Sequence, residues 1–418
     1  MRIYYYTAIY FLFERMPTEK KKPRKKVVII ANALHAFGGG ERWVLETVQR
    51  LKSDFEITIV NPASNRLPVR LTNEEMGEKY NLTGIRVVTL STAGIDAKFV
   101  GTGGFTMMVP KSSSIALLKE AVSNSDVVYV VSFNPVILYL TVTYSKQFRK
   151  RLVIGLHNPD FLTEAKVGAS LAKRAPVLLR NKLQALLIKS IKNIHAQTKT
   201  QVLALSRAGY QGNVFYIPHA VSFHPDLSKI AIHDKPFTVL FVARFAKYQK
   251  GLDMLESIIS SALAKDDSIK FRIIGSGPEG EAIIENIRKA HPKNVKVLGF
   301  VPEEKLAAEY ENASLFILPS RYETPGLSLL EAQNFGVPAV AFDVPGPKDI
   351  IVDGFQGKLV SPFDTEAFAD AIVRYKKLYA RDKTDYSRLK LRIHKSIEKR
   401  YSEDAFIAAF TKMLLEQK

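Results

Sequence analysis

The strongest constraint on the fold is a repeated alternation of short apolar runs with helical stretches, which occurs in two series. The first series predicts a helix over 41–51 and buried strands at 27–34, 56–61, 86–90, 126–132 and 151–157. The second predicts helices over 252–265 and 327–336 and strands at 237–244, 270–275, 295–300, 315–320 and 338–344. Apolar runs separated by helices indicate parallel sheets covered on both faces. We therefore expect an α/β fold with two doubly wound, Rossmann-like domains.

The domain boundaries follow from length and composition. The chain has 418 residues, more than one ordinary core accommodates. Residues 217–236 contain three prolines and little periodicity, so the linker is expected there. We expect a leader over 1–26, a first domain over 27–225, a second over 226–390, and a helical segment over 391–418 that packs back on the first domain. Residues 101–111 are rich in glycine and are expected to form a loop.

The N-terminal residues allow two interpretations. Residues 1–13 are apolar and aromatic, and a run of Lys and Arg follows over 20–26. A membrane-spanning helix needs roughly 20 apolar residues, so this segment is too short to cross a bilayer. It is either an interfacial anchor with a basic collar or a spurious leader that precedes a start at Met16. Both interpretations stay open.

Charge and cysteine content limit the partners and the compartment. The net charge of +19 favours an anionic partner: nucleic acid, an anionic membrane face or a phosphorylated substrate. The basic, amphipathic segment 171–193 is either an ordinary helix or a membrane-surface helix on the inner face of the membrane. The chain has no cysteine, which excludes thiol catalysis and fits a cytoplasmic protein.

Two cations flank a predicted strand-to-helix loop. Arg244 ends a strand, and Lys250 stands just before the next helix. Ligands of doubly wound sheets bind at the carboxyl ends of the strands, so both side chains are expected in a cleft between the domains. A planar guanidinium and a compact ammonium suit a pyrophosphate. The competing interpretation is two surface cations of a basic protein.

The segment 318–340 places two acids around a predicted helix start. Glu323 lies in the loop after a strand, and Gly326 allows close approach of the backbone to a ligand. The amides of Leu327 and Ser328 are expected to bind phosphate oxygens at the start of a helix. Glu331, one turn further on, can accept hydrogen bonds from ribose hydroxyls. A capping acid and a surface acid are the alternatives.

This segment resembles the signature of retaining GT-B glycosyltransferases of family 4, also called glycosyl transferases group 1. The matching residues are Pro319, Ser320, Glu323, Gly326, Leu329, Leu330, Glu331, Ala332, Gly336, Pro338 and Val340. Arg244 and Lys250 match the family's diphosphate-binding positions, and Gly275, Ser276 and Gly277 match its Gly-Ser-Gly turn. The resemblance extends over most of the chain from Val27.

The resemblance implies further site residues. In the first domain, Gly39 and Gly40 open a helix towards the donor phosphates, and His157 contacts the transferred sugar. In the second, the nucleotide base is expected against Phe300 and Val301. Glu323, His157, Arg244 and Lys250 are then the catalytic residues. For His157, a histidine satisfied by a local backbone partner remains the alternative.

The implied activity is retaining transfer of a hexose from a UDP- or GDP-linked donor to a glycan or lipid-linked acceptor, in the synthesis of cell-surface polysaccharide, glycolipid or glycoprotein glycans. No cofactor is expected, and the absence of a convincing Asp-x-Asp motif predicts that no metal is needed. Two departures leave the donor open: His219–Ser222 replaces Asn-Gly-Val-Asp, and Thr324–Gly326 replaces Gly-Phe-Gly.

Two rival functions stay open. A sugar-nucleotide 2-epimerase uses the same fold and needs no acceptor. A nucleic-acid-binding protein would fit the charge, but it should interleave basic residues with surface aromatics, a pattern that is not evident. Nucleic acid is therefore not an expected partner.

Overall fold

The structure, a computed structural model, describes residues 1–5, 23–31, 34, 39–63, 72–97, 105–131, 134–157, 188–221, 223, 225–226 and 236–416. The chain forms two compact units, of which one comprises Met1–Ile217 with Asp404–Lys418 and the other Pro218–Glu403. The change of unit therefore falls between Ile217 and Pro218, near the start of the expected linker, and the last helix belongs with the first unit. The sequence predicts these boundaries at 225/226 and 390/391.

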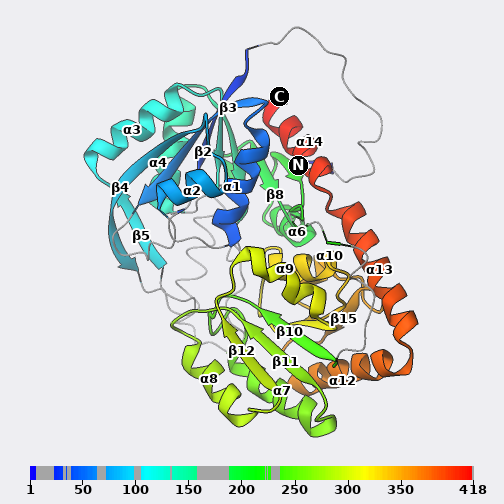
Figure 1. The fold of residues 1–418 in the computed structure, drawn as a ribbon. Helices are drawn as coiled ribbons and strands as arrows, with labels where there is room; N and C mark the ends of the chain where they lie inside the picture. The colour runs from blue at the N-terminus through cyan, green and yellow to red at the C-terminus, as the bar shows by residue number, and fades with distance from the viewer. Residues whose placement is uncertain are drawn as a thin grey trace. The chain divides into compact units, whose positions relative to one another are not determined.

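The first unit contains a sheet in the order β1-β9-β8-β7-β6-β2-β3-β4-β5 (Figure 1). Neighbouring strands are parallel except for the antiparallel pair β4 and β5. The strands are β1 (Arg2–Tyr5), β2 (Lys25–Ile30), β3 (Phe55–Ala63), β4 (Arg86–Ala97), β5 (Phe105–Pro110), β6 (Val127–Val130), β7 (Arg151–Gly155), β8 (Asn193–Ala196) and β9 (Asn213–Tyr216).

Helices cover both faces of this sheet. They are α1 (Gly39–Leu51), α2 (Asn73–Lys79), α3 (Ser112–Ser123), α4 (Pro135–Gln147), α6 (Lys199–Arg207) and α14 (Glu403–Leu415). Val128 and Val130 of β6 pack in one core cluster with Leu118 of α3 and Ile137 of α4. Tyr129 lies between them in sequence and faces the other side, because successive side chains of a strand alternate.

The N-terminal residues are part of the sheet. Strand β1 pairs in parallel with β9, and the ring of Tyr4 stacks on Phe215 with centroids 5.0 Å apart. At the other end of the expected leader, Lys25 and Lys26 begin β2. Residues 6–22, including Met16, lie outside the described residues. The expectation of a leader separate from the fold is therefore wrong at both of its described ends.

The expectation of a loop over 101–111 is also wrong for its second part. Residues 105–110 form β5, which pairs with an extension of β4 beyond the predicted strand 86–90. Cross-strand pairing decides that these residues form a strand, and local glycine content does not reveal it. The short strands β1, β8 and β9 were missed for the same reason.

The second unit contains a parallel sheet in the order β12-β11-β10-β13-β14-β15. The strands are β10 (Thr238–Val242), β11 (Lys270–Ile274), β12 (Val295–Gly299), β13 (Leu315–Leu318), β14 (Ala339–Phe342) and β15 (Gly357–Val360). The helices are α7 (Leu252–Lys265), α8 (Glu281–Ala290), α9 (Glu303–Asn312), α10 (Leu327–Asn334), α11 (Pro347–Ile350), α12 (Thr365–Arg381) and α13 (Lys383–Arg400). The α/β fold with two doubly wound sheets is confirmed.

Each face of this second sheet has its own core. Phe241 of β10 packs in a cluster with residues of α7, α8 and α12, whereas its neighbour Leu240 packs with residues of α9, α10 and α13. Both side chains are almost fully buried. This alternation explains why the strands read as continuous apolar runs.

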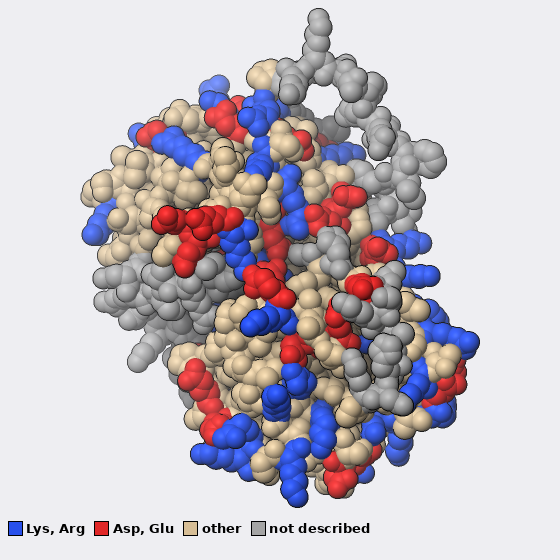
Figure 2. Space-filling view, viewed as in Figure 1, with Lys and Arg blue, Asp and Glu red and all other residues tan. Residues whose placement is uncertain are grey.

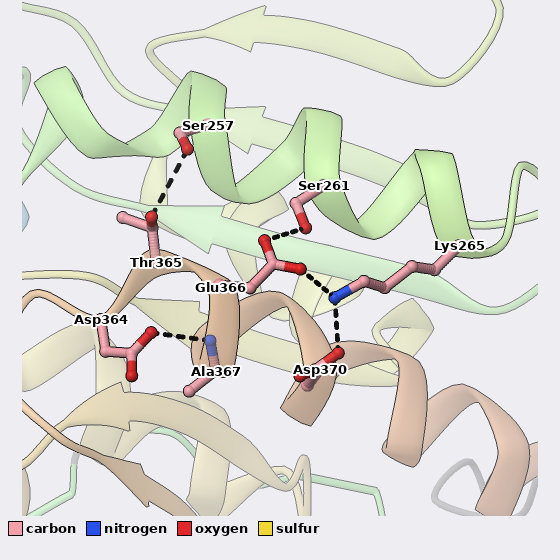
Figure 3. Close-up of polar contacts among 8 residues, drawn as sticks. All are labelled: Ser257, Ser261, Lys265, Asp364, Thr365, Glu366, Ala367 and Asp370. Carbon is pink, nitrogen blue, oxygen red and sulfur yellow. Dashed lines mark hydrogen bonds and ion pairs between the residues drawn. The ribbon is translucent and has the colours of Figure 1, made fainter.

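Helices α7 and α12 are also joined by polar contacts on their exposed sides (Figure 3). Lys265 of α7 forms ion pairs with Glu366 and Asp370 of α12, and Ser261 donates a hydrogen bond of 2.7 Å to Glu366. At the start of α12, Asp364 accepts from the amide of Ala367 at 2.9 Å.

Among the described helices, none combines the length and apolarity needed to cross a membrane.

The pairing of β1 with β9 predicts that Tyr4→Ala lowers the free energy of unfolding by about 2 kcal/mol, because the mutation removes both apolar burial and the stacked ring. Denaturant unfolding followed by circular dichroism measures the change. Tyr139→Ala, which truncates a tyrosine that is 64% exposed in the same unit, is the matched control and should be near neutral. Equal effects of the two substitutions would contradict the pairing of β1.

Candidate functional site

The candidate residues of the second unit follow four neighbouring strands. Phe300 follows β12, Gly275 follows β11, Arg244 lies after β10, and Glu323 lies in the loop after β13. These strands are adjacent in the order β12-β11-β10-β13. Because parallel strands end at the same edge, the sheet places the four loops side by side.

Glycines allow these loops to touch. Gly251 has φ of 66°, and a Cβ there would lie 2.0 Å from the carbonyl oxygen of Pro319. Gly275 has φ of 143°, and a Cβ there would lie 1.8 Å from the carbonyl oxygen of Ala243. Any larger residue would force the neighbouring backbone away, so the loop after β10 is packed directly against those after β11 and β13.

Lys250 and Glu323 form an ion pair across the loops after β10 and β13. The Nζ atom of Lys250 lies 2.6 Å from Oε1 of Glu323, and the side chains are 14% and 6% exposed. The hydroxyl of Ser320 donates to the same oxygen at 2.7 Å. A carboxylate this buried needs such partners, because an unpaired buried charge is costly.

Arg321 braces the same two loops. Its guanidinium donates two bonds of 2.8 Å to the carboxylate of Asp253 in α7 and lies 4.4 Å from the ring centre of Tyr248. Its backbone amide donates to the carbonyl of Gln249 at 2.9 Å. The hydrogen bonds from Arg321 lower the pKa of Asp253 below its ordinary value. Arg321 therefore links the loops that carry Lys250 and Glu323 to helix α7.

The start of α10 has the features expected of an anion-binding helix end. Gly326 precedes the helix with φ of 103°. The amides of Leu327 and Ser328 lie in the first turn, where no intrahelical acceptor exists. Glu331, one turn further, is 6% exposed and accepts a hydrogen bond of 2.7 Å from the hydroxyl of Tyr310.

Three candidate residues beside these loops are more accessible. Arg244 is exposed and has no acidic partner among the described residues. Phe300 is 63% exposed, which is unusual for a large aromatic side chain, and Val301 beside it is half-buried.

Gly277, with φ of 155°, lies against the backbone of Phe245.

In the first unit, Gly39 and Gly40 begin α1. Among the described residues, no atom lies within 4 Å of the position that a Cβ at Gly40 would take. Residues 35–38 of the glycine-rich segment lie outside the described residues.

His157, two residues after β7, has both ring nitrogens within hydrogen-bond distance of side chains in its own unit. Nε2 lies 2.8 Å from the hydroxyl of Tyr129, and Nδ1 lies 2.6 Å from Nε2 of Gln197. Its ring centre lies 4.2 Å from that of Trp43 in α1. Both ring partners are side chains distant in sequence, and not the local backbone partner that the sequence left as an alternative for this histidine. Contact with a sugar stays a prediction.

Sequence reasoning missed several residues that support the site, namely Tyr129, Gln197, Asp253, Tyr310 and Arg321. One signal was available: Tyr129 is the only polar-tipped side chain in the run Val127–Val131, and a hydroxyl in a buried strand needs a partner. Within the described ranges, no three His, Asp or Glu side chains come together as a possible metal site.

The brace predicts that Arg321→Lys weakens the second unit by about 1 to 3 kcal/mol, because lysine loses the two-bonded contact to Asp253 and the stacking on Tyr248. Urea unfolding measures the change. Arg388→Lys, at an exposed arginine that donates to Asp385, is the matched control and should be near neutral.

The same brace predicts a pH dependence. The pKa of Asp253 is lowered in the folded protein, so its contribution is present above the ordinary value of 3.8 and is lost as the pH falls below it. Asp253→Asn should therefore flatten the acid side of the curve of stability against pH. An unchanged curve would contradict the role of this pair.

Comparison with known proteins gives an independent result. Residues 224–388 match the family model described as glycosyl transferases group 1. The 2-deoxystreptamine N-acetyl-D-glucosaminyltransferase of Niallia circulans is 35% identical over 134 residues, which are 32% of this chain and 34% of that protein. The match thus spans about a third of this relative.

Two longer matches cover most of the chain. The GDP-mannose-dependent alpha-mannosyltransferase of Corynebacterium glutamicum is 24% identical over 356 residues, 82% of this chain and 78% of that protein. The crystal structure of Anabaena HepE in complex with UDP and glucose superposes with a TM-score of 0.69 at 14% identity, over 94% of this chain and 100% of that one. Residues 224–388 thus match the glycosyl transferases group 1 family, and the chain has the GT-B fold of its structural neighbours.

Proposed function

We propose that the protein is a retaining glycosyltransferase that moves a hexose from a nucleotide-diphosphate sugar. The observation that carries this proposal is the single sheet edge at which Arg244, Lys250 and the start of α10 gather near the buried carboxylate of Glu331. Two cations and first-turn amides suit a diphosphate, and a carboxylate suits ribose hydroxyls.

In the proposed reaction, the bond between the anomeric carbon and the diphosphate oxygen breaks first. Arg244, Lys250 and the amides of Leu327 and Ser328 stabilise the negative charge that develops on the leaving group. The acceptor hydroxyl attacks the same face of the sugar, and its proton passes to the departing diphosphate. Configuration is thereby retained without an enzyme nucleophile, and no metal is required to balance the charge.

The ion pair supports distinct roles for Lys250 and Glu323. An ammonium has three hydrogens, so Lys250 can keep its contact with Glu323 while it donates to a phosphate oxygen. Glu323, held by Lys250 and Ser320, is then fixed in one orientation against the transferred sugar. Phe300, with its large exposed fraction, offers a surface for the base beside Val301.

The donor is proposed to carry UDP or GDP. One relative is named for GDP-mannose, and the Anabaena structure holds UDP and glucose. A glycan or lipid-linked acceptor and a cytoplasmic location stay predictions. Attachment to the inner membrane face also stays a prediction, because most of the amphipathic segment 171–193 lies outside the described residues. On the face drawn in Figure 2, basic and acidic side chains are interspersed, an arrangement that does not favour nucleic acid.

We expect Arg244→Ala to abolish donor-dependent thermal stabilisation and slow donor hydrolysis, while the unfolding temperature without ligand stays unchanged, because Arg244 is exposed. UDP-, GDP- and ADP-sugars are screened with each variant. Lys247→Ala, an exposed lysine in the same loop, removes the same charge and should behave like the unmodified protein.

Full activity of Arg244→Ala would exclude the proposed diphosphate site. Appearance of an epimer when the sugar nucleotide is incubated without acceptor would favour the 2-epimerase instead.

The buried ion pair yields a second expectation. Lys250→Met should lower the free energy of unfolding by about 3 to 5 kcal/mol, because it leaves Glu323 buried without its cation. Glu323→Gln keeps an acceptor for both Lys250 and Ser320, so it should stay folded yet lose turnover. A stable Lys250→Met variant would contradict the pairing, and an active Glu323→Gln variant would contradict the role in positioning the sugar.

A further inference from the structure

A continuous chain of hydrogen bonds runs through the interior of the first unit, from the carbonyl of Ile217 through His157 to Gln197. Nε2 of His195 lies 2.7 Å from the carbonyl oxygen of Ile217, and Nδ1 of His195 lies 2.7 Å from the hydroxyl of Tyr129. The same hydroxyl lies 2.8 Å from Nε2 of His157, whose Nδ1 lies 2.6 Å from Nε2 of Gln197.

The chemistry of these groups sets the direction of every bond. A carbonyl oxygen only accepts, so Nε2 of His195 carries hydrogen. In a neutral imidazole the other nitrogen then accepts, and Tyr129 must donate its single hydrogen to His195. The oxygen of Tyr129 is left to accept from Nε2 of His157.

Burial keeps both inner groups in these protonation states. His195 and Tyr129 are fully buried. Loss of hydration lowers the pKa of His195 to about 4 and raises the pKa of Tyr129 well above its ordinary value. Near neutral pH, His195 is therefore an uncharged imidazole and Tyr129 an intact phenol.

The amide of Gln197 completes the chain at the other end. Because Nε2 of a neutral His157 carries the ring hydrogen, its Nδ1 atom accepts from the amide nitrogen of Gln197, 2.6 Å away. A longer approach of 3.2 Å to Nε2 would join two donors and is not a hydrogen bond in this tautomer. The buried Oε1 atom of Gln197 has no hydrogen-bond partner among the described residues, so the amide is held only through its nitrogen.

Close packing surrounds the hydrogen-bonded side chains. A Cβ at Gly155 would lie 2.2 Å from the hydroxyl of Tyr129 and 2.6 Å from Nε2 of His157, so glycine leaves the space that their bond occupies. Phe410 of α14 packs edge-on to Tyr129 and His195, with centroids 5.0 and 5.6 Å away. Ile217, the far anchor, is the last residue before the chain enters the second unit.

We propose that Tyr129 and His195 are positioning residues that hold His157 as the neutral tautomer with hydrogen on Nε2, so that its Nδ1 atom is a hydrogen-bond acceptor. A ligand hydroxyl would then donate to His157 and displace the amide of Gln197, which the described residues hold only through its nitrogen. This inference rests on the proposed function only in naming that hydroxyl as one of the transferred sugar. The tautomer itself follows from the chain of hydrogen bonds.

The first test is long-range ¹H–¹⁵N spectroscopy of the full chain with ¹⁵N-labelled histidine, without any ligand. The chain has eight histidines, so His157→Gln identifies the signals of His157. We expect a protonated Nε2 and an unprotonated Nδ1 in the unmodified protein, and a mixture of tautomers in Tyr129→Phe, which lacks the accepting hydroxyl. A protonated Nδ1 in the unmodified protein would overturn the proposal.

The second test is kinetic. With a sugar nucleotide that the protein turns over, Tyr129→Phe should lower kcat about tenfold and change KM less than about twofold, because orientation and not binding is lost. Tyr210→Phe is the matched control: Tyr210 is buried in the same unit, and its hydroxyl donates to the carbonyl of Ile191, outside the chain. It should alter neither the tautomer nor kcat.

A second variant disturbs the bond between Tyr129 and His157 without removing the hydroxyl of Tyr129. Gly155→Ala should disturb the tautomer and kcat as Tyr129→Phe does, whereas Gly77→Ala, where a Cβ meets no atom within 4 Å, should not. Altered stability of Tyr129→Phe with an unchanged tautomer and kcat would assign these residues a purely structural role. If the unmodified protein turns over no sugar nucleotide, the proposed function fails, while the spectra still decide the tautomer.

Discussion

The close approach of the loops after β10 and β13 is the contact on which the candidate site of the second unit depends. Gly251 lies so near the carbonyl of Pro319 that no side chain fits between them. That approach brings Lys250 within 2.6 Å of Glu323. The two hydrogen bonds from the guanidinium of Arg321 to Asp253 then anchor the loop after β13 to helix α7, which follows the loop after β10.

The two units fix their polar side chains by different physical means. In the second unit, a half-buried cation and a buried carboxylate compensate each other, and a hydroxyl donates a further hydrogen bond to the same carboxylate oxygen. In the first, neutral groups form a directed chain in which every donor meets one acceptor. A charged pair suits a site that receives a diphosphate, because its cation still has hydrogens to donate. A neutral chain suits a histidine whose tautomer matters.

The candidate residues of the second unit were predictable because of how parallel sheets end. Arg244, Lys250, Glu323 and Glu331 all follow strands that the apolar runs had located, and the strand order makes their loops neighbours. The supporting partners were not predictable. Asp253 and Tyr310 lie in helices whose sequences look ordinary, and only packing brings them to Arg321 and Glu331.

The sequence by itself determined the fold class and the positions of the chemically distinctive residues, because hydrophobic periodicity and glycine placement are local properties. Only the tertiary structure decided that residues 2–5 form an edge strand on β9, that 105–110 pairs with β4, and that Tyr129 and His195 meet His157. Except for the hairpin of β4 and β5, these contacts join segments far apart along the chain. Their energies depend on burial and on the direction of hydrogen bonds, neither of which a linear pattern specifies.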